Sequence, residues 1–431
     1  MHSNTMKLLA EQIRTNRRTL WDWHLACARK NPPPFYCSID LRNSGHKIVP
    51  VDSNLYPAGF NNICPEDRRA ATSIFRAQIE AISTQFDRPT PNRILILPES
   101  HTKNSYYIEN LFYLNQIIQE AGFETCIGWY GQLPEVHSNP VHLVSFTEKT
   151  LKAFPIIIDE KGLLSAGDFT PDLILLNNDF SSGYPKPLDT VKQPIIPSHA
   201  LGWHSRKKSE HFNYYNQLAA EFASILKIDP WLIQIDTQEV APVNFNENQG
   251  TEAVALVVDQ MISRTRAAYT QHHIKREPFV FVKNNAGTYG MGILVAHSGE
   301  EVLQLNRREK NKMSMGKNHS PIGSVVVQEG VPTATVVDRL AAEPVIYLFG
   351  CQLIGGFLRT NTQKGDEDNL NSQGMVFKKL CMSELRTPEQ DTQYEDLEEL
   401  KEEPILELVY GSIARISALA TGIELAQHRK L

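Results

Sequence analysis

A glycine-rich segment at residues 279–295 constrains this chain more than any other part of the sequence. It runs Phe-Val-Phe-Val-Lys-Asn-Asn-Ala-Gly-Thr-Tyr-Gly-Met-Gly-Ile-Leu-Val: a β-rich run that ends in a lysine, a loop, and a second β-rich run. The glycines Gly287, Gly290 and Gly292 let backbone N–H groups turn toward an anion without interference from a Cβ atom. Lys283 adds a positive charge beside them. The segment therefore predicts a cradle for the phosphates of a nucleotide.

Two familiar phosphate-binding loops do not fit this segment. A Walker loop ends in Gly-Lys-Ser or Gly-Lys-Thr, and a Rossmann turn leads into a helix. Here the lysine precedes the loop, and a further β-rich run follows it. This order resembles the lysine and flap of ATP-grasp enzymes. A tight loop without a ligand is the alternative that the segment alone leaves open.

Length and charge limit what else the chain can be. A chain of 431 residues exceeds what one hydrophobic core usually organises, so we expect two or three domains. The 43 basic and 49 acidic side chains give a net charge of −6, which provides no general attraction to nucleic acid or to an anionic membrane. We therefore expect no nucleic-acid or membrane partner, and any basic site must be local. Small-molecule substrates are the partners we expect, and a homo-oligomer is compatible with the sequence.

The start of the chain and its cysteines predict a cytoplasmic protein. The first residues lead into a charged helical pattern without the apolar core of a signal peptide, and the sequence holds no run of about 18 apolar residues. The six cysteines are scattered without a Cys-x-x-Cys pair, which disfavours a zinc site and a disulfide framework. We expect reduced thiols with structural roles.

The first part of the chain predicts helices and a hairpin. Residues 5–30 have a helical pattern that ends before three prolines at residues 32–34. Residues 36–42 and 47–52 are short extended runs joined by Asn-Ser-Gly-His, which suits a tight reversal. A helix is expected over residues 65–86, with acidic side chains in its first turn.

From residue 93 the sequence predicts alternating strands and helices. Strands are expected at residues 93–97, 123–130, 172–177 and 194–197, and helices at 104–121 and 205–226. We therefore predict an α/β (α+β) fold of three parts. These are residues 1–89, with the N-terminal helices and the hairpin; residues 90–225, an open-sheet α/β domain for substrate; and residues 226–431, the nucleotide-binding part.

The chain beyond residue 374 predicts mainly helices. The acidic stretch at residues 389–403 indicates a solvated helix or connector. The final segment, from residue 405, has an apolar helical face and predicts a closing helix packed on the core. That face consists of Ile405, Val409, Ile416, Leu419 and Ile423.

Polar residues at the ends of later strands extend the predicted nucleotide site. One expected strand ends in Gln328 and Glu329, where ATP-grasp enzymes have the hinge that meets adenine and ribose. Two strands within residues 345–359 end in Arg359, which is placed to bind phosphate or carboxylate bidentately. Asn369 then begins an Asn-Leu-x-x-x-Gly element, similar to the Asn-Leu-x-x-Gly-Gly element of glutathione synthetases but with one glycine. Structural roles are the alternative for Arg359 and Asn369.

Metal-binding residues that ATP-grasp chains carry near their end occur here in the N-terminal hairpin. Standard ATP-grasp chains finish with an Asp and a Glu-x-Asn element that hold two magnesium ions. The hairpin has Asp40 and the pair Asp52 and Asn54, whose oxygens suit a hard cation that bridges the phosphates of ATP. We therefore predict an ATP-grasp-like fold that is circularly permuted. Turn capping by these Asx side chains is the alternative.

Histidines and a short basic run lie between the open-sheet part and the nucleotide-binding part. His199, His204 and His211 lack the spacing of a metal-binding pair on a helix face, which favours structural or substrate-contact roles. The basic run at residues 206–208, after Trp203, predicts either a solvated helix start or a site for an anion or a substrate carboxylate.

Three segments resemble the proteobacterial type of glutamate-cysteine ligase: residues 279–294, residues 51–63 and the segment around Asn369. The resemblance spans most of the chain. It implies ATP-dependent joining of the γ-carboxyl group of L-glutamate to the amine of L-cysteine, which gives γ-glutamylcysteine, ADP and phosphate in glutathione synthesis. It also implies an acyl phosphate intermediate, since a carboxylate is a poor electrophile at neutral pH.

The resemblance also implies a role for each candidate site residue. Arg359 would stabilise the transferred phosphoryl group, assisted by Asn369 and Lys283. ATP would be bound by Lys283, Gly287, Gly290, Gly292, Gln328 and Glu329; Mg²⁺ by Asp40, Asp52 and Asn54; and the amino acids by Arg42, Asn61, Asn62 and Arg206.

Three other activities are compatible with the sequence. One is a different ATP-grasp carboxylate–amine ligase. Another is a small-molecule kinase, which would leave a stable phosphorylated product. The third is a nucleotide sensor without catalysis, against which the acidic and arginine elements argue.

Overall fold

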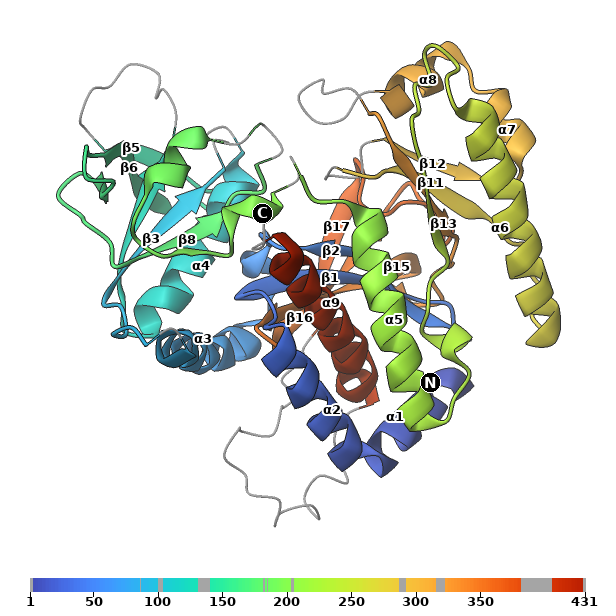
Figure 1. The fold of residues 1–431 in the computed structure, drawn as a ribbon, viewed down its shortest axis with the longest axis horizontal. Helices are drawn as coiled ribbons and strands as arrows, with labels where there is room; N and C mark the ends of the chain where they lie inside the picture. The colour runs from blue at the N-terminus through green and yellow to red at the C-terminus, as the bar shows by residue number, and fades with distance from the viewer. Residues whose placement is uncertain are drawn as a thin grey trace.

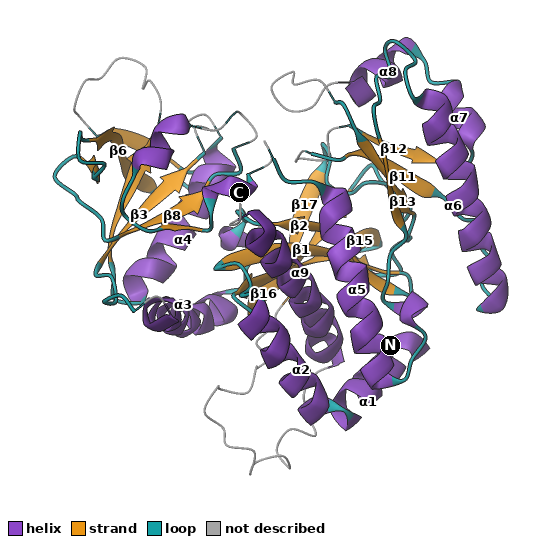
Figure 2. Cartoon of the chain, in the orientation of Figure 1, coloured by secondary structure: helices purple, strands orange, loops and turns teal. Residues whose placement is uncertain are grey.

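The described residues form three β-sheets with helices packed around them (Figure 1). The structure is a computed structural model that describes residues 3–85, 87–99, 104–130, 140–180, 183, 185–202, 205–286, 292–314, 322–380 and 405–428. A central sheet lies between an open sheet and a third, smaller sheet. Figure 2 shows the strands gathered in these sheets and the helices packed beside them, so the expected mixed α/β architecture is present.

The central sheet joins the two ends of the chain. Its order is β17-β16-β15-β1-β2, with β14 beside β15. The strands are β1 (Tyr36–Asn43), β2 (Ile48–Asn54), β14 (Val336–Val337), β15 (Leu340–Phe349), β16 (Gln352–Asn361) and β17 (Met375–Leu380). β1 pairs antiparallel with β15, and Asp40 lies opposite Val345. The predicted N-terminal hairpin is therefore confirmed, and it belongs to the same sheet as strands from the far end of the chain.

Helices from distant parts of the chain cover one face of this sheet (Figure 1). They are α1 (Asn4–Thr15), α2 (Arg17–Lys30), α5 (Lys208–Leu226) and α9 (Ser412–His428). In α1 the buried residues are Met6, Leu9, Ala10 and Ile13, which is the spacing of one helical face. Ser3 caps α1 by accepting a hydrogen bond from the Met6 N–H. The layer packs against apolar side chains of β1, namely Cys37, Ile39 and Leu41.

The closing helix is buried in this layer. A π-helical turn, Glu407–Gly411, precedes α9, and the combined helix Glu407–His428 is long and apolar enough to cross a membrane by length and composition. However, 89% of its apolar window is buried inside the protein, as in the core helix of a soluble protein. The residues of the predicted apolar face pack on the core as expected.

The open sheet has the order β5-β6-β4-β3-β8-β9, with β7 beside β6. Its strands are β3 (Arg93–Pro98), β4 (Glu124–Trp129), β5 (Val141–Val144), β6 (Thr150–Ile158), β7 (Leu164–Ala166), β8 (Leu173–Asn177) and β9 (Ile195–Ile196). The inner pairs β3/β4, β3/β8 and β4/β6 are parallel, and β3 is a continuous apolar run, as strands covered on both faces are. Helices α3 (Pro65–Gln85) and α4 (Ser105–Glu120) pack on it.

The third sheet carries the glycine-rich segment. Its order is β10-β13-β11-β12, formed by β10 (Thr237–Val240), β11 (Val280–Asn284), β12 (Ile293–Ala296) and β13 (Val325–Glu329). Helices α6 (Thr251–Gln271), α7 (Gly299–Leu303) and α8 (Arg307–Ser314) accompany it. β11 and β12 pair antiparallel with Lys283 opposite Ile293, which confirms the predicted order of strand, loop and strand.

Short helical turns complete the described chain. They are η1 (Phe60–Asn62), η2 (Lys186–Thr190), η3 (His199–Leu201) and η4 (Pro230–Leu232).

Some predicted elements differ from the structure. The helix expected over residues 5–30 is two helices, because Asn16 leaves helical geometry and its side-chain amide donates to the Gln12 carbonyl. The helix expected from residue 205 begins at Lys208. The expectation of mainly helices beyond residue 374 is wrong for β17. No prediction covered β5, β6, β7, β10, β14 and α6. The acidic stretch at residues 389–403 lies outside the described residues.

Gly422 tests how closely α9 packs against the rest of the layer. A Cβ atom at this position would lie 2.6 Å from the Asn31 carbonyl oxygen and 2.7 Å from that of Pro32. Both contacts are backbone atoms that cannot rotate away, so we expect Gly422→Ala to destabilise the fold by about 1–3 kcal/mol. The change is measurable as a lower thermal unfolding midpoint.

Gly323→Ala is the matched control, because nothing lies within 4 Å of a Cβ atom at that position. Equal unfolding midpoints for the two variants would contradict the packing described for α9.

Candidate active site

Two carboxylates face each other across the N-terminal hairpin. Asp40 of β1 and Asp52 of β2 are direct cross-strand partners. Asn54 lies two positions beyond Asp52, and side chains two apart on a strand share a face. Like charges directly opposite each other destabilise a sheet unless they are compensated. In this protein each carboxylate has a cation, supplied by a different element.

Asp40 is paired with Arg359 of β16. Arg359 Nη1 lies 2.6 Å from Asp40 Oδ2 and 2.8 Å from Glu343 Oε1, and all three residues are buried. The other oxygen of Glu343 accepts a hydrogen bond from Arg42 Nε at 3.2 Å. Burial raises the pKa of Asp40 to about 6; Arg359 opposes this shift, whereas Glu343 and Asp52 add to it. The result is a buried network of arginines and acids on the face of the central sheet that carries Asp52.

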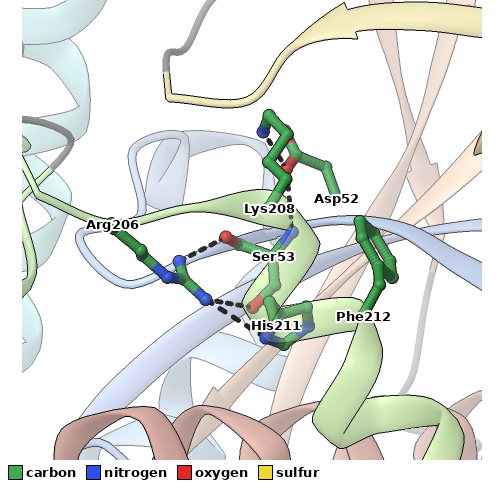
Figure 3. Close-up of a pocket in the computed structure, with 6 residues that line it drawn as sticks. All are labelled: Asp52, Ser53, Arg206, Lys208, His211 and Phe212. Atoms are coloured by element: carbon green, nitrogen blue, oxygen red, sulfur yellow. Dashed lines mark hydrogen bonds and ion pairs between the residues drawn. The ribbon is translucent and has the colours of Figure 1, made fainter. Parts of the chain in front are cut away.

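Asp52 is paired with Lys208 at the start of α5, with Lys208 Nζ 2.5 Å from Asp52 Oδ1. Burial acts to raise the pKa of Asp52, but the positive charges of Lys208, Lys283 and Arg206 hold it below its ordinary value. Asp52 is therefore ionised near neutral pH. Figure 3 shows the narrow pocket beside this pair, which is lined by Asp52, Ser53, Arg206, Lys208, His211 and Phe212.

Lys283, at the end of β11, reaches the same hairpin. Its Nζ donates to the Val51 carbonyl at 3.1 Å and to Gln328 Oε1 at 2.7 Å. Burial lowers the pKa of Lys283 to about 8, although Asp52 acts in the opposite direction. The ring of Phe281 lies 5.1 Å from this ammonium and 5.4 Å from the Arg42 guanidinium carbon. The third sheet therefore meets the central sheet where the glycine-rich segment begins.

Asn285 fixes the start of the glycine-rich loop to α5. Its carbonyl accepts from the Lys208 N–H and its Oδ1 from the Ser209 N–H, both at 2.9 Å. Gly292, at the other end of the loop, has φ +62°, a conformation that favours glycine. Gly287 and Gly290 lie outside the described residues.

Arg206 is buried behind the hairpin. Its guanidinium donates to Glu424 of α9 at 2.8 and 3.1 Å and to the Ser53 carbonyl at 2.6 Å. His211 Nδ1 lies 2.5 Å from Glu424 Oε1. Burial would raise the pKa of Glu424, but Arg206 and His211 hold it at about 2. This network ties α5 and α9 to β2 beside the carboxylate Asp52.

Glu329 is held in a buried ion pair. Lys47 Nζ lies 2.7 and 2.6 Å from its two carboxylate oxygens, and the Asp236 N–H donates to it at 3.2 Å. The ring of Trp231 lies 4.4 Å from the same ammonium. The carboxylate of Glu329 is thus occupied by partners within the protein, whereas the neighbouring Gln328 bonds directly to Lys283.

The open sheet holds the loop that carries Asn61 and Asn62. The backbone N–H groups of residues 59 and 60 both donate to Asn110 Oδ1 of α4, at 2.8 and 3.1 Å. Asn177, at the end of β8, donates to the carbonyl of residue 57 at 2.7 Å. The loop therefore rests on the carboxyl end of the parallel sheet, where ligands bind in open α/β folds.

Asn369 lies in a second loop beside the network. Its Oδ1 accepts from the Asn371 N–H at 3.0 Å. Arg42 holds the same loop by donating to the carbonyls of Asp366 and Asp368 at 3.1 and 2.5 Å. Arg42 is therefore bonded to partners within the protein.

Apart from Asn54 at the end of β2 and the three glycines, the predicted site residues fall into three groups. Those that meet at the hairpin are Asp40, Asp52, Lys283, Gln328 and Arg359. Those held by partners within the protein are Arg42, Arg206 and Glu329, and those on flanking loops are Asn61, Asn62 and Asn369.

The sequence did not predict the pairings of four charged residues in this region. Glu343 and Lys47 sit at the ends of β-rich runs and had no distinguishing pattern. Lys208 belongs to the basic run for which an anion site was one of two predictions, but its pairing with Asp52 was not predicted. Glu424 gave a usable signal, because an acid on an apolar closing helix needs a buried cation.

The oxygen atoms of Asp40, Asp52 and Asn54 fit a divalent cation that takes few of its ligands from the protein. Within the described ranges, no group of three His, Cys, Asp or Glu side chains could hold a metal ion. However, Asp40 Oδ1 is buried without a hydrogen-bond partner and lies on the strand opposite Asp52. Two carboxylates and an amide are the ligands that Mg²⁺ takes when phosphate oxygens complete its shell.

Comparison with known proteins shows the family. Residues 10–425 match the family model described as Glutamate-cysteine ligase. A protein of known structure from Methylobacillus flagellatus KT, assigned as a gamma-glutamylcysteine synthetase, is 34% identical, with 98% of this chain and 96% of that one covered and a TM-score of 0.85. No curated protein matches the chain.

Two further structures are more distant. A glutathione synthetase-like effector from Globodera pallida is 10% identical, with 87% of this chain and 84% of that one covered and a TM-score of 0.37. D-alanyl-alanine synthetase A from Vibrio cholerae O1 biovar eltor is 11% identical, with 76% and 82% covered and a TM-score of 0.31. Likeness at this level carries no argument about the site.

With a match over nearly its whole length, this chain is an ATP-dependent ligase. It belongs to the glutamate-cysteine ligase family, whose reaction forms γ-glutamylcysteine for glutathione from L-glutamate and L-cysteine. The family and activity predicted from the sequence are confirmed.

The buried Glu424 gives a prediction for stability against pH. Its pKa is about 2 in the folded protein and 4.5 ordinarily, so its contribution is complete above pH 4.5 and is lost as the pH falls toward 2. Glu424→Gln leaves Arg206 buried without its counter-charge. We expect it to lower the free energy of unfolding by about 3 kcal/mol near pH 7.

Urea unfolding of wild type and Glu424→Gln at several pH values measures this effect. The difference between the two proteins should shrink as the pH falls below 4.5. A difference independent of pH would contradict the assignment of an ionised Glu424.

Proposed function

We propose that the polar face of the hairpin is where ATP, a divalent cation and the γ-carboxylate of glutamate meet. The observation that supports this most is the convergence of Lys283, Asp52, Asp40 and Arg359 at one place. These residues come from two sheets and from distant parts of the chain. A solely structural role would not require so many charges of both signs in a region shielded from water.

The chemistry explains why the site is rich in fixed charge. Attack of the γ-carboxylate on ATP brings several negative oxygens together, and the cysteine amine then displaces phosphate from the resulting acyl phosphate. Catalysis therefore consists mainly of holding the reactants and neutralising charge. Lys283 supplies positive charge beside the phosphates, and Arg359 stabilises the phosphoryl group in transfer. Asn369 assists from the neighbouring loop.

The hairpin would bind the metal. Asp40, Asp52 and Asn54 would hold Mg²⁺, which when bound neutralises charge on the phosphates. The buried Asp40 Oδ1, which lacks a hydrogen-bond partner, supports this role. Gly287, Gly290 and Gly292 would offer backbone N–H groups to the phosphates.

Other predicted residues take supporting roles in this proposal. Gln328, bonded to Lys283, faces the nucleoside. Glu329, in its ion pair with Lys47, helps to form the same part of the site. Arg42 and Arg206, which are held by internal partners, position the loops and strand that contact the amino acids. Asn61 and Asn62 contact the amino acids directly.

We further propose that the fold is a circular permutation of the ATP-grasp arrangement. The pairing of β1 with β15 supports this, because it gives the N-terminal hairpin the place that final strands would have. The corresponding parts are residues 1–89, 90–225 and 226–431, of which the second holds the open sheet. The free cysteines of the described chain suit a cytoplasmic location.

Lys283→Met and Asp52→Asn test the site. Each removes one charge with little change of shape, and we expect each to lower the rate of ADP formation that depends on both amino acids by at least about 100-fold. The product γ-glutamylcysteine is measured by mass spectrometry, and folding by thermal unfolding.

Lys7→Met and Asp22→Asn are matched controls on exposed positions of α1 and α2. Turnover of Asp52→Asn near that of Asp22→Asn would refute both the metal role and the permutation. A phosphorylated amino acid without an amide would indicate a kinase, and ATP binding without phosphate release would indicate a sensor.

A further inference from the structure

The two carboxylates of the hairpin have cations of different kinds. Arg359 Nη1 is shared between Asp40 and Glu343, at 2.6 and 2.8 Å. Lys208 reaches Asp52 through a flexible side chain, with Nζ 2.5 Å from Oδ1. A planar guanidinium between two acids is held in one geometry, whereas an ammonium on a four-carbon stem can turn away. Lys208 is therefore the exchangeable cation of the two.

The backbone that carries Lys208 is fixed. Its N–H donates to the Asn285 carbonyl, and the next N–H, of Ser209, donates to Asn285 Oδ1, both at 2.9 Å. Two residues earlier, Arg206 is bonded to Glu424 of α9. Any movement of the ammonium must therefore come from the side chain, since the backbone is held at Asn285.

Asp52 can be reached from outside, whereas Asp40 is buried. The side chain of Asp52 is 25% exposed and that of Asp40 is 5% exposed. A divalent cation that enters between them uses Asp40 Oδ1, which has no hydrogen-bond partner, and an oxygen of Asp52. Two positive centres repel strongly at contact distance. The entering cation and the Lys208 ammonium therefore compete for Asp52.

We propose that Lys208 holds the place of the divalent cation at Asp52 and is displaced when that cation binds. The inference rests on the metal role proposed above for Asp40 and Asp52. In this exchange Asp52 always keeps a counter-charge, so the hairpin stays folded without metal. Arrival of the cation also releases the Lys208 ammonium from Asp52.

Binding of Mn²⁺ to the full chain without nucleotide, followed by electron paramagnetic resonance, tests this exchange. Lys208→Met removes the competitor, so Mn²⁺ should bind about tenfold more tightly than to wild type. A structural defect alone would weaken binding. Lys208→Arg keeps the charge and can bind the carboxylate with two N–H groups, so it should weaken Mn²⁺ binding.

Lys207→Met is the matched control for charge. Lys207 is adjacent in sequence, lies 3.7 Å from Glu239 and is 45% exposed, so its removal subtracts the same charge without touching Asp52. Its Mn²⁺ affinity should stay within about twofold of wild type. Equal affinities for Lys208→Met and Lys207→Met would overturn the exchange, as would wild-type affinity in Lys208→Arg if Lys208→Met does not fold.

Asp52→Asn separates this inference from the metal role on which it rests. Loss of Mn²⁺ binding in Asp52→Asn together with tighter binding in Lys208→Met supports the exchange. Loss in Asp52→Asn without a gain in Lys208→Met overturns the exchange alone. Wild-type binding in Asp52→Asn overturns the metal role and the exchange with it.

Discussion

Residues 36–40 of β1 pair antiparallel with residues 345–349 of β15, and the geometry of the site depends on this contact. It brings Asp40 to Arg359 and Glu343, which would otherwise lie on a separate hairpin. It also places β2 at the edge of the sheet, where Lys283 from the third sheet can reach it. Side chains alternate between the two faces of each strand. This register therefore directs apolar residues toward the helices and charged residues toward the site.

Charge compensation is the second constraint. Asp40, Asp52, Glu329 and Glu424 are all paired with a cation from another element, and each pair loses hydration when it is buried. Buried pairs of this kind seldom stabilise a fold more than apolar side chains of similar size would. Their concentration around one hairpin is therefore consistent with the site proposed there. The hydrophobic core between the helices and the opposite face of the same sheet offsets this loss of hydration.

The sequence predicted the features that depend on residues close together in the chain, and it did not predict the contacts between distant residues. The loop after Lys283, the hairpin and the strands at residues 93–98 and 173–177 were predictable, since turn residues and apolar runs are read from neighbours in the chain. The partners Lys208, Glu343 and Glu424 were not, because each acts on a residue that only tertiary structure brings near. For the same reason, the sequence did not predict that Arg42 pairs with Glu343 and Arg206 with Glu424.

The pairing of β1 with β15 also has a consequence for synthesis of the protein. A ribosome makes the hairpin that carries Asp40 and Asp52 first, whereas the strand it pairs with is made only after all strands of the open sheet and of the third sheet. Contacts so distant in sequence close late, because the chain entropy lost on joining them is recovered only when both strands exist. A nascent chain can therefore fold its open sheet long before β1 has its partner strand, and a chain released early would lack the contact of Asp40 with Arg359.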